Sequence, residues 1–526
     1  MPQAAPGAFH RATETHKPLA KVSTHVTVSR CNIRYPKGDT LKTWIKLSRV
    51  LAAAATLLLA APAAGLALAQ DAAPAASAAA SASDTASVEA TASASASAEA
   101  SSAAAPVLLA SQKALQLDKA DTTYLIFCTA MVLMMTLPGL ALFYGGMVRR
   151  KNIIATVTQS VAVTCVVAIV WWVVSYSMAF GTVASPIFGV AADKLNLFFG
   201  GFDNFMLKAV RPDTAYSATA SVPEYTWISY QMTFAIITPA LITGAFAERV
   251  KFSGLLLFMI LWSILVYAPI CHMAWGGGIM SKWGVLDFAG GAVVHCNSGV
   301  AGLVSALFLG RRKGYGTDSM PANNPIFIMV GAALLFVGWI GFNAGSEWAG
   351  DTVASAALLN TILATCMAGV SWKVVEWIFR GKPSLIGILS GMVAGLVVIT
   401  PACGFVNPTG AMICGLLAGP VCYTSAVWVK KLLGYDDSLD AFGIHGAGGF
   451  LGALLTGWLA DPKINALAQG HSVLTQLKGL ALTIVWSAVG TLIILVICKY
   501  TTGLRVTAEE EEAGLDSSLH DEVMDH

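Results

Sequence analysis

Eleven apolar stretches, each long enough to cross a lipid bilayer, follow one another after residue 120. About 20 apolar residues in a helix span the hydrocarbon core of a membrane. Inside that core only a helix or a closed barrel satisfies every backbone polar group. The sequence therefore predicts an all-α polytopic membrane protein. The predicted spans are 121–147, 152–180, 225–247, 253–271, 289–310, 325–345, 352–379, 384–401, 408–431, 440–460 and 473–500.

The composition agrees with a membrane protein. Hydrophobic residues make up 56% of the chain and charged residues 12%, about half the charged share of a soluble domain. The net charge is +2, and no basic stripe with interleaved aromatics occurs, so no nucleic acid is expected as a partner. Most cysteines lie singly in apolar runs and are interpreted as small hydrophobic residues. Whether Cys271 and Cys403, both expected near the outer face, form a disulfide is left open.

The N-terminal region is predicted to be processed rather than folded. Residues 41–69 have the form of a signal peptide, with basic residues, an apolar core and an Ala67-Leu68-Ala69 cleavage site. Because such a peptide does not normally begin forty residues into a chain, we expect residues 1–40 to be a misassigned or untranslated extension. The Ala/Ser-rich segment 70–120 cannot bury enough apolar surface to fold and is interpreted as an exported linker.

Loop charge predicts the orientation of the spans. Lys and Arg gather in alternate connections, and loops rich in these residues remain in the cytoplasm. This places the mature N-terminus outside and the C-terminus in the cytoplasm, for a membrane domain over 121–501 and a tail over 502–526 in the inner (cytoplasmic) membrane. The signal peptide independently requires an exported N-terminus. The charged connections hold Arg149, Arg150 and Lys151; Arg249 and Lys251; Arg311, Arg312 and Lys313; Lys373, Arg380 and Lys382; and Lys430 and Lys431.

An internal repeat relates the fifth and tenth spans. His295 is followed by glycines four and seven residues later, and His445 is followed by glycines at the same spacing. The sixth span, over 336–346, also resembles the first, over 136–146. The two copies of the repeat are five membrane spans apart, and an odd number of spans places them in opposite directions across the membrane. The sequence therefore predicts two inverted five-helix halves plus a C-terminal helix, with a solute path between the halves. Chance similarity between glycine-rich helices is the alternative.

The two repeat histidines are the strongest candidate site residues. A histidine in the middle of a membrane helix is costly unless it is paired or faces a cavity. Two of them at matching positions predict a shared central cavity, whereas His272 and His471 are interpreted as ordinary interfacial residues. Asp287, eight residues before His295, is expected to cap its helix and to favour a nearby cation. Asp440, five residues before His445, is expected to cap the tenth span in the same way.

Aromatic residues gather where a cation could be received. Trp275 is expected on the outer loop, and Phe234 and Phe342 lie in the motifs Gln231-Met-Thr-Phe234 and Gly341-Phe-Asn-Ala-Gly-Ser346. An aromatic face attracts a desolvated small cation by about 2 kcal/mol. Packing against the core or against lipid is the alternative for each of these residues.

Several motifs, in order, resemble the ammonium transporter (Amt/MEP/Rh) family, of bacterial Amt type, from about residue 120 to the end. The motifs are Gly244-Ala-Phe-Ala-Glu-Arg249, Asp287-Phe-Ala-Gly-Gly-x-Val-Val-His295, Gly341-Phe-Asn-Ala-Gly-Ser346 and Asp440-x-Phe-Gly-Ile-His445-Gly-x-x-Gly. The resemblance implies a homotrimer with one pore per subunit. Tyr230 departs from the pattern, because a phenylalanine often stands at this position.

The resemblance also implies roles for individual residues. Its external ammonium site is formed by Trp275, Phe234 and Ser346, with Thr400 close by and Asp287 in support. Phe234 and Phe342 form the stacked gate below that site, and His295 and His445 are the twin histidines of the pore. No cofactor and no metal are implied.

The implied function is ammonium transport across the membrane. Ammonium would be recruited outside and deprotonated, and ammonia would pass through the hydrophobic pore with or without the proton. Methylammonium would serve as an analogue. The acidic tail, with its run Glu509–Glu512, resembles a regulatory C-terminus that contacts PII-type signal proteins; a solvated charged face is the alternative for this run.

Three other functions remain to be weighed. The first is an ammonium sensor with little flux, and the second is a transporter of another small solute, such as methylammonium or carbon dioxide. The third is an intramembrane enzyme. The sequence disfavours an enzyme, because it shows no third ligand at metal-site spacing, no Ser/His/Asp arrangement and no glycine-rich phosphate loop.

Overall fold

The computed structural model describes residues 117–217 and 220–524. The predicted extension, the signal peptide and all but the end of the predicted linker lie outside these residues. The described part of the chain contains helices and two isolated backbone bridges, and no strand. Ten of its helices are long and apolar enough to cross a membrane. The remaining predicted span, 384–401, is α14 (Leu385–Ile399), which is apolar, mostly buried and only 15 residues long. The prediction of an all-α polytopic membrane fold is confirmed.

Most of the membrane-length helices are built from several segments, where η marks a π-helical or 3-10 stretch. The first five are α2 (Lys119–Met134), η1 (Met135–Leu140) and α3 (Ala141–Met147); η2 (Arg150–Asn152), α4 (Ile153–Val170), η3 (Trp171–Ser175) and α5 (Tyr176–Phe180); α7 (Glu224–Phe246); α8 (Phe252–Trp262), η5 (Ser263–Tyr267), α9 (Ala268–Trp275) and α10 (Ile279–Lys282); and η6 (Gly291–Cys296) with α11 (Asn297–Leu309). The next five are α12 (Pro325–Ala344) and η7 (Gly345–Glu347); α13 (Thr352–Arg380); α15 (Pro408–Tyr423), η8 (Thr424–Val429) and α16 (Lys430–Leu433); η9 (Phe442–Gly446) with α17 (Ala447–Leu459); and α18 (Val473–Thr501). Short elements complete the described part: α6 (Ala192–Leu195), η4 (Phe205–Leu207), η10 (Ala466–Ala468), α19 (Ala508–Ala513) and α20 (Leu515–His520).

Small residues allow the helices to lie close together. α13 packs along both α14 and α15. A Cβ atom added to Gly415 of α15 would lie 2.4 Å from the carbonyl oxygen of Ala364 in α13. Glycine therefore lets these backbones approach more closely than any other residue would, as is common between membrane helices.

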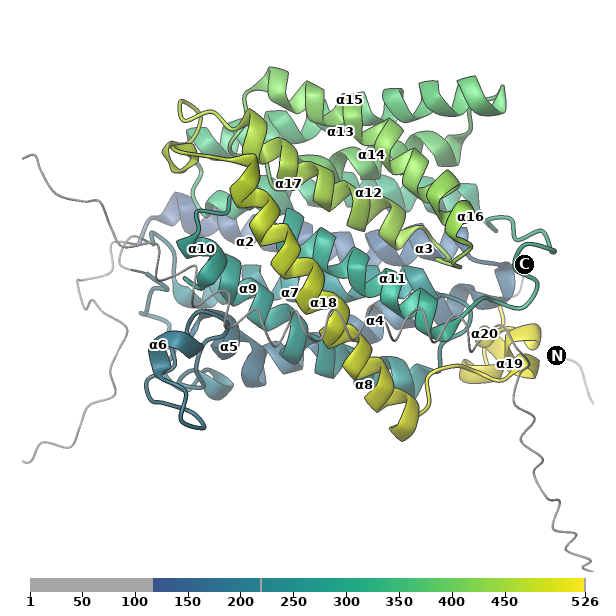
Figure 1. Cartoon of the computed structure of the whole chain (residues 1–526), viewed down its shortest axis with the longest axis horizontal. Coiled ribbons are helices and arrows are strands. Elements are labelled where there is room, and N and C mark those ends of the chain that lie inside the picture. The colour runs from purple at the N-terminus through teal and green to yellow at the C-terminus, as the bar shows by residue number, and fades with distance from the viewer. Residues whose placement is uncertain (1–116, 218–219, 525–526) are drawn as a thin grey trace, which may run out of the picture. The chain divides into compact units, whose positions relative to one another are not determined.

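The bundle has two ends that differ in chemistry. Figure 1 shows α19 and α20 at the end where α3 and α16 lie, and this end is called the tail end below. The short helices α6 and α10 lie at the opposite end, called the Trp275 end after the last residue of α9.

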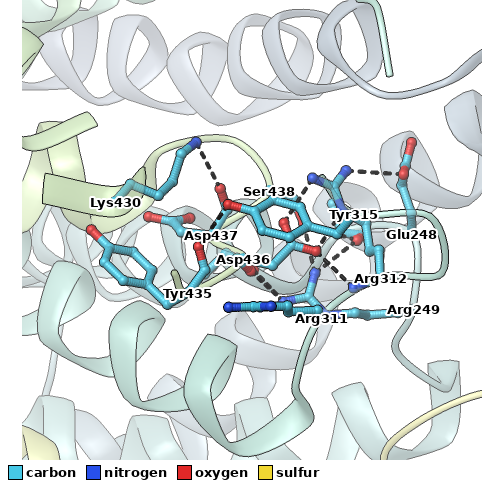
Figure 2. A network of polar contacts seen from close by, with 12 residues as sticks. Glu248, Arg249, Arg311, Arg312, Tyr315, Lys430, Tyr435, Asp436, Asp437 and Ser438 are labelled. Carbon is cyan, nitrogen blue, oxygen red and sulfur yellow. Dashed lines mark hydrogen bonds and ion pairs between the residues drawn. The ribbon is translucent and has the colours of Figure 1, made fainter. Parts of the chain in front are cut away.

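The tail end is held by a network of buried charges (Figure 2). Glu248 forms ion pairs of 2.8 Å with Arg149 and 3.0 Å with Arg312, and Arg312 also pairs with Asp436 at 2.8 Å. Arg249 is fully buried and donates to the carbonyl oxygen of Asp436 at 2.6 Å. Burial alone would raise the pKa of Glu248, but Arg312 and Arg149 together hold it below its usual value. The network joins loops from four different parts of the sequence.

The acidic run of the tail docks onto this end of the bundle and does not form a fully solvated face. Glu511 is buried and accepts hydrogen bonds from Arg505 at 2.8 Å and from the backbone N–H of Lys313 at 2.6 Å. Asp516 accepts from the backbone N–H of Ala155 at 2.8 Å. The tail is thus tied to the basic loop that holds Lys313 and to the first turn of α4 by charge-assisted hydrogen bonds, which are stronger than neutral ones.

Candidate functional site

His295 and His445 lie side by side in the middle of the described bundle. Their ring centroids are 5.3 Å apart, the planes differ by 19°, and the two Nδ1 atoms are 3.3 Å apart. Both residues are buried. A hydrogen bond between two ring nitrogens needs one donor and one acceptor. If both rings are neutral, only one of them therefore carries its hydrogen on Nδ1.

Glycines bring the two histidine segments together in a reciprocal way. A Cβ atom on Gly299 would lie 2.1 Å from the backbone nitrogen of Gly446, and a Cβ atom on Gly449 would lie 2.6 Å from that of Cys296. In both cases the glycine four residues after one histidine meets the residue directly after the other. This contact is what an inverted repeat predicts, because each half then places the same backbone position against its partner.

The segment that carries His295 is capped by Asp287, as predicted. Its carboxylate accepts hydrogen bonds from the backbone N–H groups of residues 290, 291, 292 and 293, at 2.9, 2.5, 2.9 and 3.0 Å. Burial raises the pKa of this carboxyl group, and the four hydrogen bonds oppose that rise. A capping carboxylate satisfies the N–H groups that a helix start leaves without intrahelical partners.

The prediction that Asp440 caps the second histidine segment is wrong. Asp437 is the cap, and its carboxylate accepts from the backbone N–H groups of Ala441 at 3.0 Å and Phe442 at 2.8 Å. Asp440 has a left-handed backbone with φ of 60°, which is not the extended conformation of a helix cap, and it forms an ion pair with Lys430. The repeat contained the missed signal, because Asp437 precedes His445 by eight residues just as Asp287 precedes His295.

A row of aromatic rings leads from the Trp275 end to the histidines. Phe234 and Phe342 are stacked, with centroids 4.1 Å apart and planes within 16°. The ring of Trp275 meets Phe234 edge-on at 5.9 Å, and Phe342 lies 6.1 Å from the ring of His295. The predicted aromatic residues and the first histidine therefore form one continuous series. Trp275 is the last residue of α9 and is half-buried, rather than part of a loop as expected.

Trp339 is a neighbour of the site that the sequence did not single out. Its indole stacks on His295, with centroids 5.2 Å apart and planes within 20°. Its Nε1 donates to the hydroxyl of Thr400 at 2.8 Å, and that hydroxyl donates to the carbonyl of Leu396. In this arrangement Thr400 supports the wall beside His295. Trp339 lies three residues before Phe342 on α12, so helical spacing places both side chains on one face.

Ser346 lies where α12 passes into η7. Its hydroxyl donates to the carbonyl of Phe342 at 2.9 Å and lies 3.4 Å from the hydroxyl of Tyr230. The Tyr230 hydroxyl also lies within hydrogen-bond distance of the carbonyl oxygens of Gly341 and Phe342, at 2.9 and 2.8 Å. The extra oxygen of this tyrosine therefore contacts the last turn of α12.

His272 is not the interfacial residue that was expected. It is buried, and its two ring nitrogens lie 3.0 Å from the carbonyl of Ala179 and 2.9 Å from that of Asn196. It therefore braces the base of the long connection between α5 and α7. Cys271 and Cys403 are both buried and are free thiols. In the part of the chain that the structure describes, no group of three or more His, Cys, Asp or Glu side chains could hold a metal ion.

The site retains one buried polar atom with no partner. Nε2 of His295 has no hydrogen-bond partner, although the side chain is 1% exposed. Such an atom costs free energy unless it meets a ligand or water. The rings of Trp339 and Phe342 and the second imidazole lie around the His295 ring, so its surroundings are mostly apolar.

Comparison with known proteins gives a consistent result. The family model described as "Ammonium Transporter Family" matches residues 123–524. An "Ammonium transporter" of Aquifex aeolicus is 46% identical over 412 residues, which is 77% of this chain and 93% of that protein. An "Ammonium transporter" of Bacillus subtilis is 44% identical, over 77% of this chain and 98% of that protein. Among solved structures, Saccharomyces cerevisiae Mep2 superposes with a TM-score of 0.67 and 32% identity, over 75% of this chain and 90% of that one.

Proposed function

Because the chain belongs to the ammonium transporter family, we propose that it carries ammonium across the cytoplasmic membrane along a path lined by His295 and His445. The family consists of membrane transporters, so the chain is not an enzyme. The observation that carries the proposal is the unbroken series of rings from Trp275 to His445, with the unpartnered Nε2 of His295 beside it.

The Trp275 end recruits the cation. The faces of Trp275 and Phe234 attract ammonium, and such contacts are worth about 1–2 kcal/mol as water is removed. The hydroxyl of Ser346 accepts a hydrogen bond from the cation. Asp287 adds a buried carboxyl group whose hydrogen bonds favour its charged form. Thr400 acts through Trp339, which it holds in place.

Beyond the stacked Phe234 and Phe342, the solute crosses as ammonia. A bare ammonium ion in a narrow apolar path loses its hydration at a cost of several kcal/mol, whereas neutral ammonia loses far less. Because potassium has no proton to give up, this step excludes it. Inside, ammonia forms a hydrogen bond with Nε2 of His295. It then moves along the His295–His445 pair toward the other end of the path. The proton either returns outside or follows through the imidazole pair.

Loop charge supports an orientation with the tail end in the cytoplasm and the Trp275 end outside. The chain then acts as a homotrimer with one path per subunit, as the resemblance implies. A PII-type protein binds at the tail end, where α19, α20 and the basic loops present charged groups. A pull-down with purified PII protein, with and without ATP and 2-oxoglutarate, tests this partner. We expect binding to the full chain and its loss when residues 502–526 are removed. Binding that persists without these residues would contradict the tail's role.

A sensor with little flux is the second candidate. One solved structure with a TM-score of 0.68 and 27% identity is titled "Sensor Amt Protein". A sensor and a transporter share the same fold, so flux decides between them.

The deciding experiment is uptake of labelled methylammonium by cells that lack their own ammonium carriers. We expect uptake by the wild type and its loss, or loss of selectivity against potassium, in His295→Ala and His445→Ala. His471→Ala is the matched control, because this histidine lies in a loop and bonds only the nearby carbonyl of Ala468. No uptake by a well-expressed wild type would favour the sensor.

A further inference from the structure

The two capping aspartates receive a second, similar contact at opposite ends of the bundle. At the Trp275 end, Nε1 of Trp275 donates to the backbone carbonyl of Asp287 at 2.8 Å. At the tail end, Nζ of Lys430 donates to the backbone carbonyl of Asp437 at 3.3 Å. In each half the donor comes from the end of the helix that precedes the capped segment. Lys430 and Trp275 therefore make the same kind of contact with the two capping aspartates, at opposite ends of the bundle.

The Lys430 ammonium group is held by two oxygen-bearing groups, as a bound cation would be. Besides the carbonyl of Asp437, Nζ forms an ion pair with the carboxylate of Asp440. Figure 2 shows Lys430, Tyr435 and Asp437 gathered at one side of the tail-end network, where Tyr315 donates from its hydroxyl to the carbonyl of Tyr435 at 3.0 Å. The side chains of Lys430 and Asp440 are 20% and 34% exposed, so the pair lies at the boundary between the bundle and the solvent.

The site is linked to the inner histidine by a short stretch of chain. Asp437 and Asp440 precede His445 by eight and five residues. His445 lies in η9, the short segment that Asp437 caps. The carboxylate and the carbonyl oxygen that Lys430 contacts are groups that would also hold a free ammonium or potassium ion. In this chain the Lys430 ammonium group holds that place.

We infer that Lys430 is a tethered ammonium group which fills the inner counterpart of the recruitment site and keeps cytoplasmic cations away from the path. The inference rests on the proposed function and on the proposed orientation. A tethered cation competes at a high effective concentration, whereas a free ion must be drawn from solution. The outer site lacks such a group, since an indole takes the corresponding position, and it therefore remains open to ammonium.

Lys431 provides a natural control. It is the next residue on α16, it is exposed, and it has no ion pair among the described residues. Neutralising Lys431 removes one positive charge, as neutralising Lys430 does, but it leaves the Lys430 ammonium group in its site. A difference between the two lysines would therefore report on the site rather than on surface charge.

The test uses right-side-out membrane vesicles from cells that lack ammonium carriers, loaded with either potassium or choline. Influx of labelled methylammonium is measured for wild type, Lys430→Met, Lys431→Met and Lys430→Met/Asp440→Asn. We expect internal potassium to slow influx about fivefold more in Lys430→Met than in the wild type, which corresponds to about 1 kcal/mol. Lys431→Met should match the wild type. The double variant should lose the potassium effect, because it lacks the carboxylate that binds the ion.

Equal influx with potassium and choline in a folded Lys430→Met protein would overturn the inference while leaving the proposed function intact. A folded Lys430→Met protein that shows no influx with either internal cation would also overturn the inference. The role of Lys430 would then be structural. If Lys430→Met does not fold, Lys430→Gln is measured in the same way with the same criteria. Absence of influx in the wild type would instead refute the proposed function.

Discussion

Asp287 and Asp437 stand in equivalent places at opposite ends of the described bundle. Each lies eight residues before a histidine, and each carboxylate accepts backbone N–H groups of the segment that carries it. Each also offers its own backbone carbonyl to a donor from the preceding helix. The equivalence fixes both imidazoles through the same kind of local structure, so changes at either aspartate should reach the histidine next to it.

Removing the second cap should destabilise the protein. Asp437→Ala leaves the N–H groups of Ala441 and Phe442 without their acceptor, and loss of a helix cap costs about 0.5–2 kcal/mol. We expect a lower thermal unfolding midpoint for the detergent-solubilised protein. Asp440→Ala should lower it less, because Asp440 caps no helix. The reverse order of the two midpoints would contradict the assignment of the cap.

Gly299→Ala should prevent the two histidine segments from meeting. The added Cβ would lie 2.1 Å from the backbone nitrogen of Gly446, and backbone cannot move aside as a flexible side chain can. We expect a loss of more than about 3 kcal/mol or failure to fold, judged by monodisperse elution and by the unfolding midpoint. Gly302→Ala is the control, because its Cβ would meet the Cβ atoms of Ala245 at 3.1 Å and Ala441 at 3.5 Å. Equal behaviour of the two variants would show that the close contact is unimportant.

The stacked phenylalanines should control selectivity. Phe342→Ala removes the ring that lies between Phe234 and His295 and leaves an opening in its place. We expect water and hydrated cations to enter, so methylammonium uptake should become sensitive to competition by external potassium. Phe450→Ala, on the exposed face of α17, should leave uptake unchanged. A Phe342→Ala protein with unaltered selectivity would exclude a gating role.

The charged network should make the tail end sensitive to acid. Arg312 and Arg149 lower the pKa of Glu248, and Arg312 and Arg249 lower that of Asp436, in both cases against the effect of burial. A carboxyl group whose pKa is lower in the folded than in the unfolded state stabilises the fold at pH values above its unfolded-state pKa. This contribution is lost as the pH falls through the folded-state pKa. We therefore expect the unfolding midpoint to decline below the ordinary carboxyl values of 4.5 and 3.8.

Glu248→Gln provides the matching mutation. It leaves Arg149 and Arg312 partly buried without one of their partners, and breaking a buried pair costs about 3–5 kcal/mol. The variant should have a lower midpoint at neutral pH and a smaller decline on acidification. Asp213→Asn, in an exposed pair with Arg211, should change neither quantity. An unchanged acid response in Glu248→Gln would indicate that other groups cause it.

The sequence by itself determined the class of fold, because apolar stretches of membrane length permit little other than helices. It also identified the two histidines, since ionisable residues in such stretches are rare, and it identified Asp287 as a cap. Residue type singled out Trp275, Phe234 and Phe342, and motif resemblance added Ser346, Thr400 and a role for each of these residues. These residues could be found because each carries a local signal in its type, spacing or neighbours.

Only the tertiary structure decided how the halves meet. The stacking of Trp339 on His295 and the 3.3 Å contact between the imidazoles join residues that are far apart in the chain. The choice between Asp437 and Asp440 depended on a backbone angle, and the place of Lys430 depended on the loop that folds over it. Hydrophobic spacing records which face of a helix is buried, but it does not record which partner that face will meet. That choice is made when close packing brings the glycines of both halves into contact.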